Sequence, residues 1–125
     1  MDLLDSQVDE LQRFYPGAAL HRRADGTGLI EIHEFPLPKG WNADLTTVYF
    51  VVPLGYPMAR PDCFWTSVEL RLVTGGVPAN TGMNGGHGLP QEKLWFSYHP
   101  STWNPNLDRL LTYAYLVRRR LEEAR

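Results

Sequence analysis

The chain has 125 residues, a formal net charge of -2 and a single cysteine. This length fits one domain over residues 1–125, and the slightly acidic charge argues against a nucleic-acid binder, whose domains usually have a pI above about 9. One cysteine excludes a disulfide framework within the chain and a zinc site built from cysteines. No apolar run approaches the roughly 20 residues that cross a bilayer, and the acidic N-terminus is unlike a signal peptide. We therefore expect a cytoplasmic protein that binds no membrane.

Helical patterns stand near both ends of the chain. Near the N-terminus, apolar residues recur at three- and four-residue steps until Pro16-Gly17 stops the pattern: Leu4, Val8, Leu11 and Tyr15. A second helix is predicted to run to near Arg125, with Pro105 just before it. Its apolar face is formed by Leu107, Leu110, Leu111, Ala114, Val117 and Leu121.

Between the two helices the sequence predicts four strands: Ala18–Ala24, Gly28–Phe35, Leu45–Val52 and Asp62–Thr66. Asp25-Gly26 is a hairpin signal between the first two. Glu69–Val73 is expected to be a short strand or an extended segment. The stretch 74–88 carries six glycines among fifteen residues, and so long a loop in a compact domain is often functional. The resulting class is α+β, with helices on one side of a four-stranded antiparallel meander.

Two further expectations concern large side chains. Trp41 lies in a turn rich in proline and glycine, so it is the tryptophan expected to be most exposed, whereas Trp103 is expected to anchor the last helix. The run 118–120 consists of three arginines, which suits a solvated face in the final turns of a helix.

Two motifs resemble the ubiquitin-conjugating (UBC) superfamily. Tyr56-Pro57, Pro61 and Phe64 are similar to the Tyr-Pro…Pro connector between its third and fourth strands. The segment 103–107, Trp-x-Pro-x-Leu, resembles the motif that opens the helix after its active site. Together with the order of elements, this resemblance covers nearly the whole chain and implies a UBC-like fold, although the two further C-terminal helices of common UBC enzymes are absent.

The chain departs from common UBC enzymes at the active site. The stretch before Trp103 contains no cysteine, and Pro78-Ala79-Asn80 stands as a remnant of the usual His-Pro-Asn segment, with Val77 in place of the histidine. The pattern instead resembles prokaryotic family E of the superfamily, which has an Asp-x-Phe-Trp strand and a Trp-x-x-Ser-x-His segment. Here these motifs read Asp62-Cys63-Phe64-Trp65 and Trp95-Phe96-Ser97-Tyr98-His99, with one residue fewer between Trp and Ser.

Ser97 and His99 are the leading catalytic candidates. In an extended segment, residues two apart point to the same side with Cα atoms roughly 6.5 Å apart, so an imidazole could take the serine proton. Asn80 is the candidate donor to an oxyanion, with Asn84 as an equally placed competitor. The alternatives are a capped turn for Ser97 and His99, and a turn asparagine for Asn80.

Two other residues have chemical potential but are expected to play structural roles. Cys63 is a rival nucleophile, because a thiolate is far more nucleophilic than an alkoxide. It falls at a strand position where UBC folds carry an apolar residue, so we expect it in the core. His87, in the glycine-rich loop, is expected to be solvated. Metal binding by His87, His99 and an acid has no supporting ligand spacing, so neither a metal nor another cofactor is expected.

The resemblance implies a transferase for a bacterial ubiquitin-like protein. Its partners would be that modifier and a ThiF-type adenylating enzyme, with a JAB-type metalloprotease in the same pathway. Ser97 would carry the modifier as an oxyester. Two alternatives remain open: a UBC-like module that binds a ubiquitin-like protein or its activating enzyme without chemistry, and an interaction domain of the RWD type unrelated to ubiquitin-like proteins.

Overall fold

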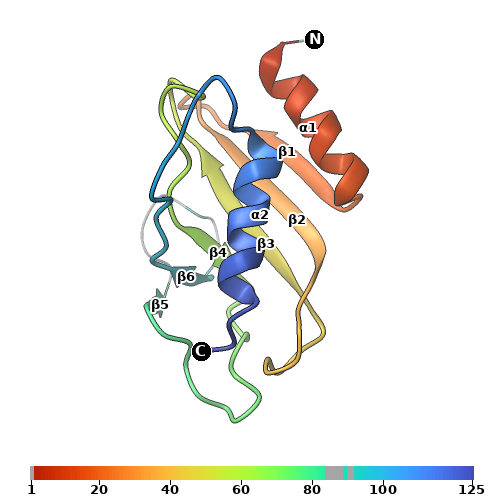
Figure 1. The fold of residues 1–125 in the computed structure, drawn as a ribbon, viewed down its shortest axis with the longest axis vertical. Coiled ribbons are helices and arrows are strands. Elements are labelled where there is room, and N and C mark those ends of the chain that lie inside the picture. The colour runs from red at the N-terminus through yellow and green to blue at the C-terminus, as the bar shows by residue number, and fades with distance from the viewer. Residues whose placement is uncertain (1, 84–88, 90–91) are drawn as a thin grey trace.

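The computed structural model describes residues 2–83, 89 and 92–125 and has the α+β architecture expected from the sequence (Figure 1). Two helices lie against one face of an antiparallel sheet. Among the described residues, neither helix is long and apolar enough to cross a membrane. The elements are α1 (Leu3–Phe14), β1 (Ala18–Arg22), β2 (Gly28–Pro36), β3 (Leu45–Val52), β4 (Phe64–Thr66), β5 (Thr81–Met83), β6 (Leu94–Phe96) and α2 (Leu110–Leu121).

Helix α1 begins at a side-chain cap and is tied to the rest of the fold by one buried amide. Oδ1 of Asp2 accepts a hydrogen bond from the Asp5 N–H at 2.8 Å, as helix N-caps commonly do. The Oε1 atom of Gln7 accepts from the backbone N–H of Leu110 at 3.0 Å and from the hydroxyl of Tyr56. This single side chain therefore joins α1, the start of α2 and the connector before β4.

The first four strands form the meander that the sequence predicts, in the order β1-β2-β3-β4. Gly26 closes the first hairpin with a φ of 89°, a conformation that favours glycine. The pairing of β2 with β3 shifts register between Ile32 and Phe35. The intervening Glu34 has a positive φ of 57°, which identifies the irregularity as a bulge.

Two short strands extend this meander, so the sheet of the described residues is larger than the sequence suggests. β6 pairs with β4, and β5 pairs with β6 at the edge. Both lie in or after the stretch interpreted as irregular, because three-residue strands are too short to show a period. The segment Glu69–Val73 forms no strand. Leu72 instead makes an isolated bridge with Trp41.

The last helix begins three residues later than predicted. α2 starts at Leu110, after the N-cap residue Arg109, whose backbone N–H donates to Oγ1 of Thr112 at 3.0 Å. Leu107 lies before the helix and is 71% exposed, so its place on the apolar face was predicted wrongly. It falls in the same 3.6-residue spacing as the true helical face, which is why periodicity included it.

The core lies between the sheet and α2, and two expectations about large side chains were wrong there. Trp41 is only 4% exposed, and its Nε1–H donates to the Leu121 carbonyl at 2.7 Å. Arg120 is buried rather than solvated, and burial lowers the pKa of its guanidinium. It donates hydrogen bonds to the carbonyls of Ala79, Glu123 and Arg125. The C-terminal end of α2 is thereby fixed to the segment before β5.

Candidate active site

The pairing of β4 with β6 brings two short segments together at one end of the sheet. The segment 62–63 precedes β4, and the segment 97–99 follows β6; because the strands are antiparallel, these two ends meet. The backbone N–H of Cys63 donates to the carbonyl of Tyr98 at 2.9 Å, which continues the ladder beyond the strands. The Tyr113 hydroxyl on α2 donates to the Cys63 carbonyl at 2.6 Å and holds the segment from the helix side.

Ser97 and His99 lie side by side, as the Ser-x-His spacing predicts for an extended segment. The Oγ atom of Ser97 lies 3.4 Å from Nε2 of His99. The other ring nitrogen, Nδ1, lies 2.6 Å from Oδ1 of Asp62. The three side chains thus form a carboxylate–imidazole–hydroxyl array, in which the carboxylate orients the ring and selects the tautomer that leaves Nε2 free to accept a proton.

Asp62 is a member of this array that the sequence reasoning missed. The motif Asp-x-Phe-Trp drew attention to its position, but only as part of a resemblance. Asp62 is 35 positions before Ser97 in the chain, and the spacing carries no sign that the two segments meet. A usable signal would have been the pairing of β4 with β6, which brings the residues before one strand next to the residues after the other.

Cys63 is buried, as expected, but polar side chains lie close to it. The side chain is 5% exposed, and its Sγ lies 3.9 Å from Nδ1 of His99. Burial raises the pKa of the thiol, and the neighbouring charge of Asp62 adds to the rise. A raised pKa disfavours the thiolate, so this geometry does not favour Cys63 as the nucleophile over Ser97.

Asn80 lies next to Ser97 through the backbone. The N–H of Ser97 donates to the Asn80 carbonyl at 2.9 Å, at the position where β5 begins to pair with β6. Asn80 has a positive φ of 58°, which asparagine tolerates better than most residues, and its side chain is exposed. An oxyanion role for its amide stays a prediction. Asn84 and His87 lie outside the described residues.

The connector before the site is held by aromatic side chains. Nε1–H of Trp103 donates to the Pro57 carbonyl at 2.9 Å, and its ring lies 6.1 Å from that of Tyr56. Trp103 therefore anchors the connector that leads to Asp62, while its anchoring of the last helix stays a prediction. The Tyr56-Pro57 peptide bond in this connector is cis.

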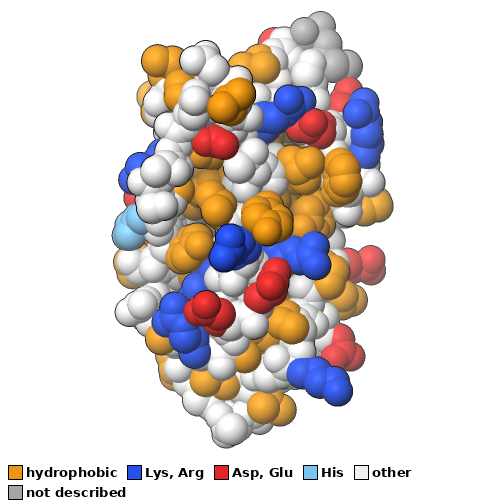
Figure 2. Space-filling model, in the orientation of Figure 1, with side chains coloured by type: hydrophobic (Ala, Val, Ile, Leu, Met, Phe, Trp, Pro, Cys, Tyr) orange, Lys and Arg blue, Asp and Glu red, His pale blue; other side chains and the backbone are white. Residues whose placement is uncertain are grey.

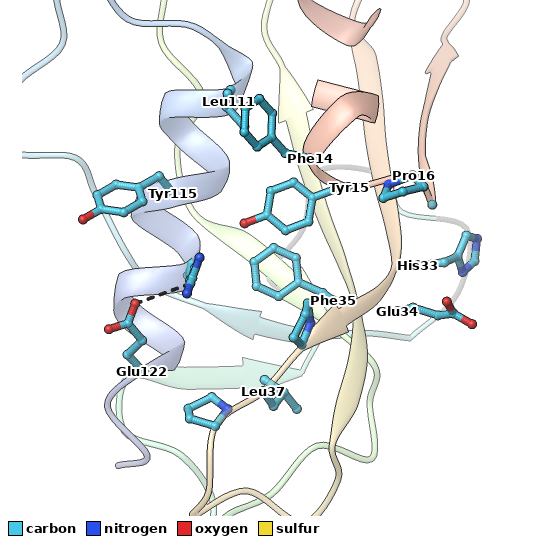
Figure 3. A pocket seen from close by; sticks show the side chains of 14 residues that line it. Phe14, Tyr15, Pro16, His33, Glu34, Phe35, Leu37, Leu111, Tyr115 and Glu122 are labelled. Carbon is cyan, nitrogen blue, oxygen red and sulfur yellow. Dashed lines mark ion pairs between the residues drawn. The ribbon is translucent and has the colours of Figure 1, made fainter. Parts of the chain in front are cut away.

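A separate groove of about 710 Å³ lies between the end of α1, the bulge of β2 and α2 (Figure 3). Tyr15 and Phe35 stack in it with ring centroids 5.1 Å apart, and the ion pair between Arg118 and Glu122 lies at its rim. On the face that α2 crosses, hydrophobic side chains are exposed among charged ones (Figure 2). None of the catalytic candidates lines this groove, so the chemistry and the groove are distinct features.

One comparison with known proteins decides the family. The family model described as Prokaryotic E2 family E matches residues 20–124, which is most of the chain. The chain belongs to this family. Neither the curated proteins nor the solved structures gave a significant match. Membership of an E2 family, that of the ubiquitin-conjugating enzymes, agrees with the observed fold and with a role in prokaryotic ubiquitin-like conjugation. It carries the general expectation of a ubiquitin-like partner and an activating enzyme.

Proposed function

We propose that this member of Prokaryotic E2 family E is a transferase that carries a ubiquitin-like protein as an oxyester on Ser97. The observation that supports it is the array in which His99 lies 3.4 Å from Ser97 Oγ and 2.6 Å from Asp62 Oδ1. The modifier would arrive as a thioester on a ThiF-type adenylating enzyme. A JAB-type metalloprotease in the same pathway would remove it from targets.

In the transfer of the modifier to Ser97, His99 acts first as a general base and then as a general acid. Nε2 accepts the Ser97 proton as Oγ attacks the carbonyl carbon of the thioester, and a C–O bond forms. The C–S bond then breaks, and His99 returns the proton to the departing thiolate of the activating enzyme. Asp62 keeps the ring oriented and stabilises the imidazolium between these steps. Asn80 is the proposed donor to the oxyanion that forms on the carbonyl.

Transfer from an oxyester needs more assistance than transfer from a thioester, because an alkoxide is the poorer leaving group. The same pair supplies it in reverse: His99 Nε2 accepts a proton from the amine or hydroxyl of the target as that group attacks the carbonyl carbon, and it returns the proton to Ser97 Oγ as the ester C–O bond breaks. The position of His99 supports this second role, since about half of its side chain is exposed and open to an incoming acceptor.

The test is intact-mass spectrometry of the protein incubated with the activating enzyme, the ubiquitin-like protein and ATP. We expect an adduct that resists thiol reductant, is cleaved by hydroxylamine and is lost in Ser97→Ala. Ser101→Ala is the matched control, because this exposed serine lies four residues away in the same loop. An adduct that persists in Ser97→Ala, or one that thiol reductant cleaves, would overturn the proposal.

The second candidate function is non-catalytic binding of the modifier or its activating enzyme. The observation that favours it is the absence of a cysteine in the stretch before Trp103. Stable binding with no covalent adduct in the same experiment would select it. Membership of an E2 family favours both of these functions over an RWD-type domain unrelated to ubiquitin-like proteins.

A further inference from the structure

Asp62, Cys63 and His99 bring three kinds of metal ligand to one point. Nδ1 of His99 lies 2.6 Å from Oδ1 of Asp62 and 3.9 Å from Sγ of Cys63, and the ligand atoms all lie within 4.8 Å of one another. A nitrogen, a sulfur and an oxygen donor together suit Zn²⁺. We propose that these three residues form a zinc site whose fourth position is open.

The backbone at Cys63 makes this convergence possible. Consecutive side chains of an extended strand point to opposite faces, so Asp62 and Cys63 should not reach the same atom. Cys63 instead has a φ of 60°, in the left-handed region that non-glycine residues rarely adopt. This turn directs both side chains toward His99. Strained backbone of this kind concentrates at functional sites.

Two of the three ligand pairs require only a small adjustment to hold the ion, and the third, from Asp62 to Cys63, lies within 4.8 Å and would close by up to about 1.2 Å. With Zn–S near 2.3 Å and Zn–N and Zn–O near 2.1 Å, tetrahedral geometry separates the ligand atoms by about 3.4–3.6 Å. The pair from Asp62 to His99, now at 2.6 Å, would open by less than about 1 Å. The pair from Cys63 to His99, at 3.9 Å, would close slightly.

The surroundings of the sulfur also suit a metal-bound thiolate. The Nε1–H of Trp95 is buried and makes no geometrically acceptable hydrogen bond within the described part of the chain. Donation from this N–H toward the Cys63 sulfur acts to lower the pKa of the thiol, against the larger, raising effect of burial. A donor that faces a sulfur in this way tunes and orients a metal ligand from outside the coordination sphere. Burial of Cys63 on the other sides keeps competing water away.

Zinc at this site would switch off the proposed oxyester chemistry, a consequence that rests on the proposed function. Binding releases the thiol proton of Cys63 to solvent and places the metal on Nδ1 of His99. The neutral ring then carries its proton on Nε2, the atom that faces Ser97. With Nε2 protonated, His99 cannot accept the serine proton. Zinc and Ser97 activation therefore exclude each other.

The binding test uses the metal alone on the full chain. We expect one equivalent of Zn²⁺ by calorimetry, and a thiolate-to-metal absorption band when Co²⁺ is the probe. Cys63→Ser should lose the band and weaken Zn²⁺ binding at least about tenfold. The matched control is His21→Ala, because His21 lies 2.9 Å from Glu31 in a similar histidine–carboxylate pair without a cysteine. Absence of the band in the wild type, or equal Zn²⁺ affinity in Cys63→Ser, overturns the site.

A second measurement separates this inference from the proposed function. Zn²⁺ should suppress the Ser97 adduct at least about tenfold, a zinc-selective chelator should restore it, and Cys63→Ser should resist the suppression. The charging of the activating enzyme is followed separately, so that an effect of zinc on that enzyme is recognised. Zinc binding with no Ser97 adduct under any condition leaves the site standing and refutes the proposed function. A Ser97 adduct with no zinc binding supports the proposed function and refutes the zinc site.

Discussion

Replacing Asp62 by asparagine is the most direct test of the site as an array rather than a pair. The asparagine keeps the size of the side chain and removes its charge. His99 then faces a neutral amide in place of the carboxylate that lies 2.6 Å from Nδ1, so the charge that stabilises the imidazolium is lost, and an amide N–H turned toward Nδ1 would favour the tautomer that has Nε2 protonated. Ser97 and its distance from the ring are left in place. Asp62 acts through His99, so its role is that of a positioning residue.

The size of the effect follows from the exposure of the pair. A hydrogen bond to a charged group contributes about 1.5–3 kcal/mol. Side-chain exposure of 49% for Asp62 and 55% for His99 allows solvent screening, which places the contribution near the lower value. About 1.5 kcal/mol corresponds to a rate change of roughly tenfold. A buried serine-protease triad loses about 10⁴-fold on the equivalent substitution, so the expected loss here is much smaller.

The assay is the single-turnover rate of adduct formation from the charged activating enzyme, followed by intact mass with a zinc-selective chelator present. We expect the maximal rate to fall about tenfold, while the concentration of activating enzyme that gives half the maximal rate stays unchanged. Asp44→Asn is the control, because Asp44 is an exposed aspartate outside the array. A loss under twofold in Asp62→Asn, with Ser97→Ala inactive, would refute the role of Asp62. A change only in the half-saturating concentration would refute it as well.

Three further predictions concern the proposed oxyanion donor and two hydrogen bonds that stabilise the fold. Asn80→Ala should slow adduct formation about 100-fold or more if its amide meets the oxyanion, and a loss under threefold in the same assay would contradict that role. Tyr113→Phe leaves the Cys63 carbonyl without its donor at 2.6 Å, so the free energy of unfolding in urea should fall by about 1–3 kcal/mol; an unchanged value would mean that water replaces the hydroxyl. Trp41→Phe removes the bond to the Leu121 carbonyl and should lower the unfolding free energy by a similar ~1–3 kcal/mol, whereas no change would mean that this hydrogen bond adds nothing to stability.

Local sequence patterns predicted most elements of the fold. The helix near the N-terminus and the strands β2 and β3 were predictable because each is long enough to show a period or a β-branched run. β5 and β6 were not predictable, since three residues show no period and both lie beside a glycine-rich stretch. Leu107 illustrates the opposite error, because it matches the helical spacing yet lies before the cap that starts the helix.

The residues of the candidate site also differ in whether the local sequence could predict their positions. Ser97 and His99 were predictable because two residues in one extended segment determine their own geometry. Asn80 was placed near them only by resemblance, and the structure joins it to Ser97 through the backbone. The burial of Cys63 followed from its residue type, but nothing in the local sequence indicated that its sulfur approaches a histidine.

By itself, the sequence determined the elements that depend on neighbours within a few residues: helix faces, strand alternation, turn glycines and the Ser-x-His pair. Tertiary structure decided what depends on segments far apart in the chain. The pairing of β4 with β6 placed Asp62 against His99, and the positive φ at Cys63 turned its sulfur toward the same ring. The reason is physical: register between distant strands is set by which side chains the whole core must bury, and no local pattern contains that information.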